Sequence, residues 1–104
     1  MSDDVDVMDP DVVDKKKLQS KEPSFYKVIL LNDHFTPMDF VVEVLQKYFE
    51  KTYEDAERIM KDVHEKGSGI AGLYTHDLAE TKSQQANDYA KQKTYPFKTI
   101  IQEN

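Results

Sequence analysis

Residues 25–41 read FYKVILLNDHFTPMDFV, and this stretch decides the fold. Its first part is a run of aromatic and aliphatic side chains that is too short for a helix, which predicts a strand over 25–31. A polar turn over 32–35 follows. Thr36 and Pro37 then predict the start of a helix, because the threonine hydroxyl can accept from the backbone ahead of it and proline fits the first helical position.

The helix that follows is amphipathic. Its apolar stripe has i, i+3 and i+4 spacing and consists of Met38, Val41, Val42, Leu45, Tyr48 and Phe49. A second helix is predicted to begin between Thr52 and Asp55 and to end at Gly67, which would act as a left-handed cap. The apolar face of this second helix consists of Ala56, Ile59, Met60 and Val63.

Two strands and one helix complete the predicted order. Short strands are expected over 70–74 and 96–101, on either side of a third helix that starts near Thr75 or Asp77. The apolar residues of that helix are Leu78, Ala79, Ala86, Tyr89 and Ala90. The order β-α-α-β-α-β predicts an α+β fold: a single small domain with a three-stranded antiparallel sheet packed against helices.

The chain of 104 residues divides into two parts. Residues 1–23 are rich in aspartate and show no sustained apolar period, which predicts a flexible, disordered N-terminal tail. Residues 24–104 form the expected core domain, which is large enough to fold alone.

Composition excludes several classes of function. The net charge of −6 and the lack of a basic face argue against nucleic-acid binding, and the absence of cysteine removes thiolate catalysis and cysteine-ligated metal sites. No apolar run is long enough to span a bilayer. We expect a cytoplasmic, monomeric protein that does not act on membranes and has no cofactor.

The residues alone leave the candidate sites open. His34, His64 and His76 lack helical ligand spacing, so no metal site is expected. The polar run from Asn32 to His34 is typical of a turn or of a binding loop, and ordinary turn chemistry is the simpler reading. Met60 and His64 share a helix face, which is equally compatible with a partly buried structural histidine.

Several motifs in order resemble the signature of ClpS adaptors. They are Tyr26-Lys27-Val28-Ile29-Leu30-Leu31-Asn32-Asp33, Phe35-Thr36-Pro37-Met38-Asp39-Phe40-Val41, Met60-Lys61-Asp62-Val63-His64, Ala79-Glu80-Thr81-Lys82 and Tyr95-Pro96-Phe97, together with Gly67 and Gly72. The resemblance covers residue 25 to the C-terminus. It implies the same β-α-α-β-α-β fold, whose topology also resembles the C-terminal domain of the ribosomal stalk protein.

The resemblance implies an adaptor, not an enzyme. Such an adaptor binds N-degrons, which are proteins whose first residue is Leu, Phe, Tyr or Trp, and delivers them to a Clp AAA+ unfoldase–peptidase. By position, Asn32, Asp33 and His64 would bind the substrate α-ammonium group. The pocket for the substrate side chain would be lined by Thr36, Met38, Val41, Met60, Val63 and Phe97. The N-terminal domain of the unfoldase would contact Glu80, Thr81 and Lys82.

The chemistry of these residues suits those roles. An amide carbonyl, a carboxylate and a neutral imidazole nitrogen are three acceptors for the three donors of an ammonium. The chain departs from the family at His34, where a second acid is common, and the departure removes one negative charge near the ammonium. Two other hypotheses remain open: an unfoldase- or ribosome-docking module that does not read N-termini, and a hydrolytic or metal enzyme.

Overall fold

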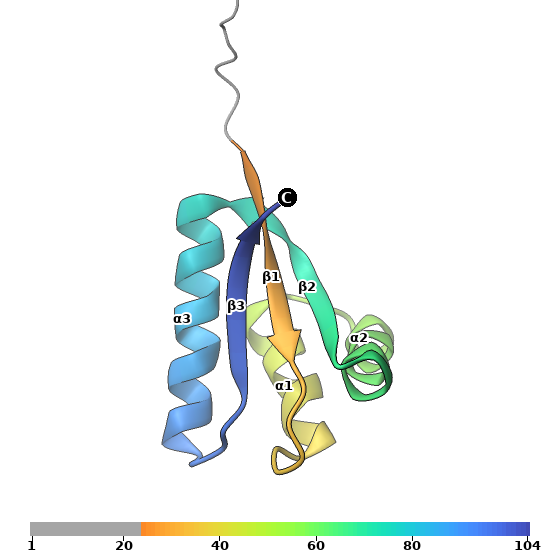
Figure 1. Cartoon of the computed structure of the whole chain (residues 1–104). Coiled ribbons are helices and arrows are strands. Elements are labelled where there is room, and N and C mark those ends of the chain that lie inside the picture. The colour runs from red at the N-terminus through yellow and green to blue at the C-terminus, as the bar shows by residue number, and fades with distance from the viewer. Residues whose placement is uncertain (1–23) are drawn as a thin grey trace, which may run out of the picture.

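The computed structural model describes residues 24–104, so the predicted flexible tail over 1–23 lies outside the described residues. Six elements follow one another in the order β-α-α-β-α-β (Figure 1). Their bounds are β1 Phe25–Leu31, α1 Met38–Tyr48, α2 Tyr53–Lys66, β2 Ser68–Thr75, α3 His76–Gln92 and β3 Lys98–Glu103. The predicted α+β order is confirmed, and β2 is longer at both ends than the expected strand over 70–74.

The sheet has β1 in the middle, with the strand order β2-β1-β3 and both pairings antiparallel. Ile29 lies opposite Ile70 on one side and Ile100 on the other, and Ile70 and Ile100 are exposed. Val28 and Leu30, which point to the opposite face, are fully buried. The helices therefore cover one face of the sheet and leave the other open.

Of the six elements, α1 contributes the most residues to the core between the sheet and the helices. The predicted stripe on α1 is correct in Val41, Val42, Leu45 and Phe49, which are all buried. Phe40 and Val44 are buried as well and lay outside that stripe, because α1 lies behind the sheet and also contacts both α2 and α3. A narrow stripe is expected only where a helix has a single packed side.

The start of α1 differs from the prediction. Pro37 is the N-cap residue, one position before the first helical residue, and no side chain caps the helix. The Thr36 hydroxyl donates to Asp33 Oδ2 at 2.8 Å instead of accepting from the helix. A hydroxyl can donate or accept, and the carboxylate three residues earlier is the stronger partner.

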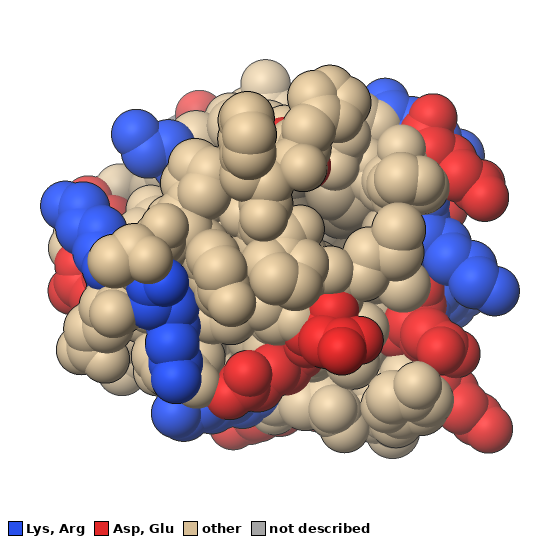
Figure 2. Space-filling model, turned by 90° about the horizontal axis from the view of Figure 1, so that it is seen from below, with Lys and Arg blue, Asp and Glu red and all other residues tan. Residues whose placement is uncertain are grey.

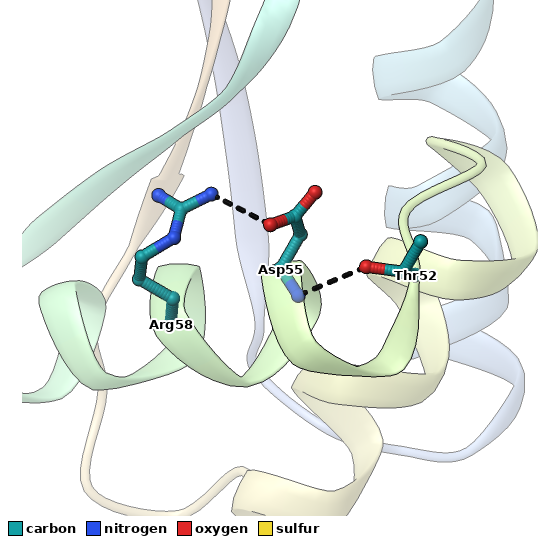
Figure 3. Close-up of polar contacts among 3 residues, drawn as sticks. All are labelled: Thr52, Asp55 and Arg58. Atoms are coloured by element: carbon teal, nitrogen blue, oxygen red, sulfur yellow. Dashed lines mark hydrogen bonds and ion pairs between the residues drawn. The ribbon is translucent and has the colours of Figure 1, made fainter.

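Both ends of α2 agree with the sequence prediction. Thr52 Oγ1 accepts from the Asp55 backbone N–H at 3.1 Å, and Arg58 forms an ion pair with Asp55 at 3.0 Å (Figure 3). Gly67 ends the helix with φ of 91°, a left-handed conformation that glycine adopts without strain. The capping residues at the two ends therefore fix where α2 begins and ends, and α2 is the helix that carries Met60, Val63 and His64.

The third helix begins where it was expected, with Thr75 at the N-cap position. Ala79, Ala86 and Ala90 are buried against the sheet, whereas Leu78 is 46% exposed. The prediction that Leu78 belongs to the buried apolar face of α3 is therefore wrong. Leu78 lies in the first turn of the helix, where its side chain is not over the core. A buried pair, Ser83 and Thr99, joins α3 to β3 through their hydroxyl groups.

Candidate functional site

A pocket opens at the lower end of the domain in Figure 1, near the loop after β1 and the beginning of α1. Its cavity is about 150 Å³. The lining residues are Leu31, Asn32, Asp33, His34, Thr36, Met38, Val41, Met60, Val63, His64 and Phe97. Figure 2 looks at this end, where uncharged side chains occupy the middle of the face and lysine and arginine side chains lie toward its edge.

The pocket is built by joining the end of β1 to the end of α2. The Asn32 backbone N–H donates to the Gly67 carbonyl at 3.0 Å, and the Gly67 N–H donates to the Val63 carbonyl at 3.0 Å. Asn32 is thereby placed beside the last turn of α2, which carries His64. This backbone hydrogen bond brings the side chains of Asn32 and His64, which are distant in the sequence, to the same rim of the pocket.

The floor of the pocket is apolar and closely packed. Val41 on α1, Val63 on α2 and Phe97 before β3 are exposed by only 7%, 4% and 4%. Gly69 on β2 allows the strand to pass close to α2, because a Cβ atom there would lie 2.9 Å from Val63 Cγ2. The floor therefore comes from three separate elements held by core packing, which makes it rigid and preformed.

The rim carries the polar and adaptable groups. Asn32, His34 and His64 are exposed, Met60 is half-buried, and Met38 is 47% exposed. An amide oxygen and neutral imidazole nitrogens can accept hydrogen bonds, and methionine side chains adjust their shape to a ligand. A ligand that fits this site has an apolar group for the floor and a hydrogen-bond donor for the rim.

Asp33 is already engaged within the loop. Its Oδ1 accepts from the backbone N–H groups of Phe35 at 2.8 Å and Thr36 at 2.7 Å, and its Oδ2 accepts from the Thr36 hydroxyl. Partial burial alone would raise the pKa of the Asp33 carboxyl, but the hydrogen bonds from Thr36 and Phe35 outweigh it and lower that pKa below 3.8. Asp33 thus contributes a fixed negative charge and also holds the loop in shape.

All nine residues predicted to bind the substrate line this one pocket. Asn32, Asp33 and His64 lie with the side-chain set Thr36, Met38, Val41, Met60, Val63 and Phe97. Leu31 also lines it and was missed, since a strand residue next to a polar turn gives no signal of its own. His34 lines the pocket too.

The three residues predicted to contact an unfoldase lie elsewhere, on the first turns of α3 at the upper end of Figure 1. Glu80 and Thr81 are exposed, and together with Gln84 and Gln85 they line a shallow depression. Lys82 is different, because its ammonium donates to the Tyr48 carbonyl at 2.8 Å and lies 5.4 Å from the centre of the Tyr74 ring. Its position couples α3 to the end of α1.

Within residues 24–104, no three His, Cys, Asp or Glu side chains are arranged to hold a metal ion. His34 and His64 share the pocket, whereas His76 stacks edge-on against Tyr26 with ring centres 4.8 Å apart. No helix in the same part of the chain has the length and apolar character needed to cross a membrane.

These features define a small α+β domain with a pocket that has an apolar floor and a polar rim. The family model described as ATP-dependent Clp protease adaptor protein ClpS matches residues 21–100. The chain is 47% identical, over 98 residues that cover 94% of each protein, to the ATP-dependent Clp protease adapter proteins ClpS of Burkholderia mallei (strain SAVP1) and Burkholderia cenocepacia (strain HI2424). The chain therefore belongs to the ClpS family of Clp protease adaptors.

A solved structure supports the same assignment. The structure of Agrobacterium tumefaciens ClpS2 bound to L-phenylalaninamide superposes with a TM-score of 0.78 at 35% sequence identity. The match covers 80% of this chain and all of the other. The expected fold and the family resemblance are both confirmed by these comparisons.

Proposed function

We propose that this protein binds the N-terminal residue of substrate proteins in the pocket and delivers them to a Clp AAA+ unfoldase–peptidase. The substrates are proteins that begin with Leu, Phe, Tyr or Trp. The observation that carries the proposal is the gathering of an apolar floor and a polar, acceptor-rich rim in one cavity. Asn32, Asp33 and His64 bind the α-ammonium group, and the floor receives the side chain.

The size of the cavity supports a single large side chain as ligand. The cavity is about 150 Å³, and an apolar cavity of about 150 Å³ is known to hold a benzene ring. The related Agrobacterium protein was solved with L-phenylalaninamide, an amino-acid amide with a phenyl ring and a free α-amino group. The same two features, a ring and an amine, match the floor and the rim here.

Asp33 supports binding through its charge more than through new contacts. A carboxylate has about four acceptor positions, and three hydrogen bonds within the loop already use most of them. The lowered pKa keeps the carboxylate ionised at neutral pH, so it attracts an ammonium. Asn32 and His64 provide the direct acceptors.

The test compares a Leu-starting peptide with the same peptide after N-acetylation, by fluorescence anisotropy. Acetylation removes the positive charge and two donors and leaves the side chain unchanged. We expect the acetylated peptide to lose at least about 30-fold in affinity, because it loses hydrogen bonds from a charged donor, which contribute about 1.5–3 kcal/mol each. Equal affinities would mean that the domain does not read N-termini.

Delivery is assigned to Glu80 and Thr81 on α3, which are exposed and lie away from the pocket. Glu80→Lys should weaken binding to the N-terminal domain of the unfoldase and leave peptide binding intact. Asp88→Lys, at an exposed position further along the same helix, is the matched control. If the two variants behave alike, the unfoldase does not contact this part of α3. Lys82 is a poor probe, because its loss would also break the bond to Tyr48.

A further inference from the structure

The face of the sheet that the helices leave open carries an apolar patch, and this face is turned toward the viewer in Figure 1. Ile70, Ile29 and Ile100 lie in one row across the three strands, and Leu73 and Phe25 extend the patch toward the start of β1. All of these except Ile29 are 43–52% exposed, and they make up half of the large exposed apolar side chains of residues 24–104. A contiguous apolar area of this kind marks an interaction surface.

The charge on this face is positive. Lys27 lies between Leu73 and Gln102 across the sheet, and Lys98 lies beside Leu31 at the other end of β1. In the described strands, no aspartate or glutamate occupies a position on this face. Within residues 24–104, neither lysine forms an ion pair. The face therefore attracts a segment that carries both apolar side chains and carboxylates.

The first fourteen residues of the chain have this composition. They contain six aspartates and no lysine or arginine. The apolar residues Val5, Val7, Met8, Val12 and Val13 each stand between aspartates, and the basic residues of the tail follow only from Lys15 onward. Residues 3–14, called the acidic segment below, thus match the open face both in apolar character and in charge.

The acidic segment is attached where it can reach the patch. Phe25 is the first residue of β1, so the preceding chain joins the sheet at one end of the patch. The seven residues of β1 span about 20 Å. Residues 15–24 connect the acidic segment to β1, and ten residues span up to about 35 Å when extended, which allows a turn and a return over the strand. Because the link is covalent, the effective concentration of the segment is on the order of millimolar.

We propose that the acidic segment binds the open face of the sheet. Its valines and methionine cover the row of isoleucines, and its carboxylates lie beside Lys27 and Lys98. A second copy of the chain is a poorer occupant, because two such faces would bring lysine against lysine. Strand addition at the outer edge of β3 is also disfavoured, because the Asn87 side chain already accepts from the Thr99 N–H at 2.8 Å and donates to its carbonyl at 3.2 Å. The inference does not depend on which ligand the pocket binds.

The absence of cysteine allows one spin label to be placed at a chosen position in the full chain. Pro10→Cys puts the label between the two halves of the acidic segment, and paramagnetic relaxation enhancement of the backbone N–H signals then reports where the segment lies. We expect enhancement at Ile70 and Ile100, in the middle of the open face. Enhancement confined to residues next to Phe25, or strongest at pocket residues such as His64, would overturn the inference.

Paired lysine variants test the contribution of charge. Lys27→Gln combined with Lys98→Gln should lower the ratio of docked to free segment at least about threefold, which is within the range of two exposed charge pairs. Lys61→Gln combined with Lys91→Gln makes the same charge change at exposed positions on α2 and α3. Equal losses from the two pairs would assign the attraction to overall charge and overturn the inference.

A variant of the patch tests the apolar contact. Ile100→Gln should weaken the enhancement at Ile70, whereas Leu78→Gln, at a similarly exposed position on α3, should leave it unchanged. An equal effect of both variants would contradict docking on the sheet.

A mixed sample identifies the occupant. Spin-labelled chain without isotope label is mixed with ¹⁵N-labelled parent chain, so that only contacts between molecules produce enhancement. We expect none at Ile70 and Ile100. Enhancement as strong as in the singly labelled chain would mean that the face binds another copy, and the inference would fail.

Discussion

Replacing Asp33 distinguishes its charge from its role in the loop. The carboxylate accepts three hydrogen bonds, from the N–H groups of Phe35 and Thr36 and from the Thr36 hydroxyl, at distances between 2.7 and 2.8 Å. Asp33→Ala removes all three. Asp33→Asn removes the charge but retains Oδ1 as an acceptor for both N–H groups, and the Thr36 hydroxyl can rotate to accept from the new amide.

The magnitudes follow from these bonds. Replacing an aspartate that accepts from backbone N–H groups by alanine costs about 0.5–2 kcal/mol, whereas asparagine is nearly equivalent to aspartate at such positions. Because Thr36 is only partly buried and water can reach the loop, we expect Asp33→Ala to lower the free energy of unfolding by about 1–2 kcal/mol. Asp33→Asn should lower it by about 0.5 kcal/mol or less.

Peptide binding should follow the same order. Asp33→Asn loses an exposed attraction to the ammonium, which corresponds to at most about fivefold in affinity. Asp33→Ala also frees the loop that positions Asn32 and Met38, and it should weaken binding by about tenfold or more. Asp88→Asn, at an exposed position on α3, controls for the loss of one negative charge.

Urea unfolding and fluorescence anisotropy measure the two effects. The proposed role of Asp33 in the loop would be wrong if Asp33→Ala unfolded like the parent, or if the Asn and Ala variants lost equal affinity. The second outcome would mean that the charge alone matters.

The same carboxylate makes stability depend on pH. The folded-state pKa of Asp33 lies below its ordinary value of 3.8, so protonation favours the unfolded chain. Its contribution is complete above pH 3.8 and is lost as the pH falls through the lowered folded-state value. The stability difference between the parent and Asp33→Asn should therefore be constant above that pH and should shrink below it. A difference that persists unchanged in acid would contradict the hydrogen-bonded carboxylate.

Further variants test other parts of the structure. Met38→Ala should admit Ile- and Val-starting peptides with little loss for Leu, since a crowded branched side chain costs about 1–3 kcal/mol; continued exclusion of both peptides would assign that selection to another residue. Thr52→Ala should lower the free energy of unfolding by about 1 kcal/mol, whereas Thr75→Ala should do so much less, because only Thr52 makes a side-chain cap hydrogen bond; equal losses in urea unfolding would refute the capping role. His64→Ala removes a hydrogen-bond acceptor from the rim, so it should weaken the binding of a Leu-starting peptide; an unchanged affinity would remove His64 from the ammonium site.

The order of elements could be predicted from the sequence because each element carries its own local signal. The period of the apolar residues, the Thr52 cap and the left-handed Gly67 all act within a few residues of chain. The start of α1 could not be predicted correctly, because the choice of the Thr36 hydroxyl between the helix and Asp33 depends on the loop geometry. Burial of Phe40 and Val44 depends likewise on how many neighbours surround α1.

The site was predicted residue by residue only through the resemblance. From the residues alone, Asn32 and His64 gave two separate weak signals, a turn and a helix-face histidine. What joins them is the backbone hydrogen bond from Asn32 to Gly67, a contact between segments far apart in the sequence.

The most direct test of the central claim is an NMR titration with L-phenylalaninamide, and with N-acetyl-L-phenylalaninamide as the control. We predict that the free amine shifts the signals of residues that line the pocket, among them Asn32, Val63 and His64. Glu80 and Thr81 should not shift, and the acetylated compound should have little effect. Pocket signals that stay unchanged, or that respond equally to both compounds, would contradict the claim that this domain reads the N-terminal residue of its substrates.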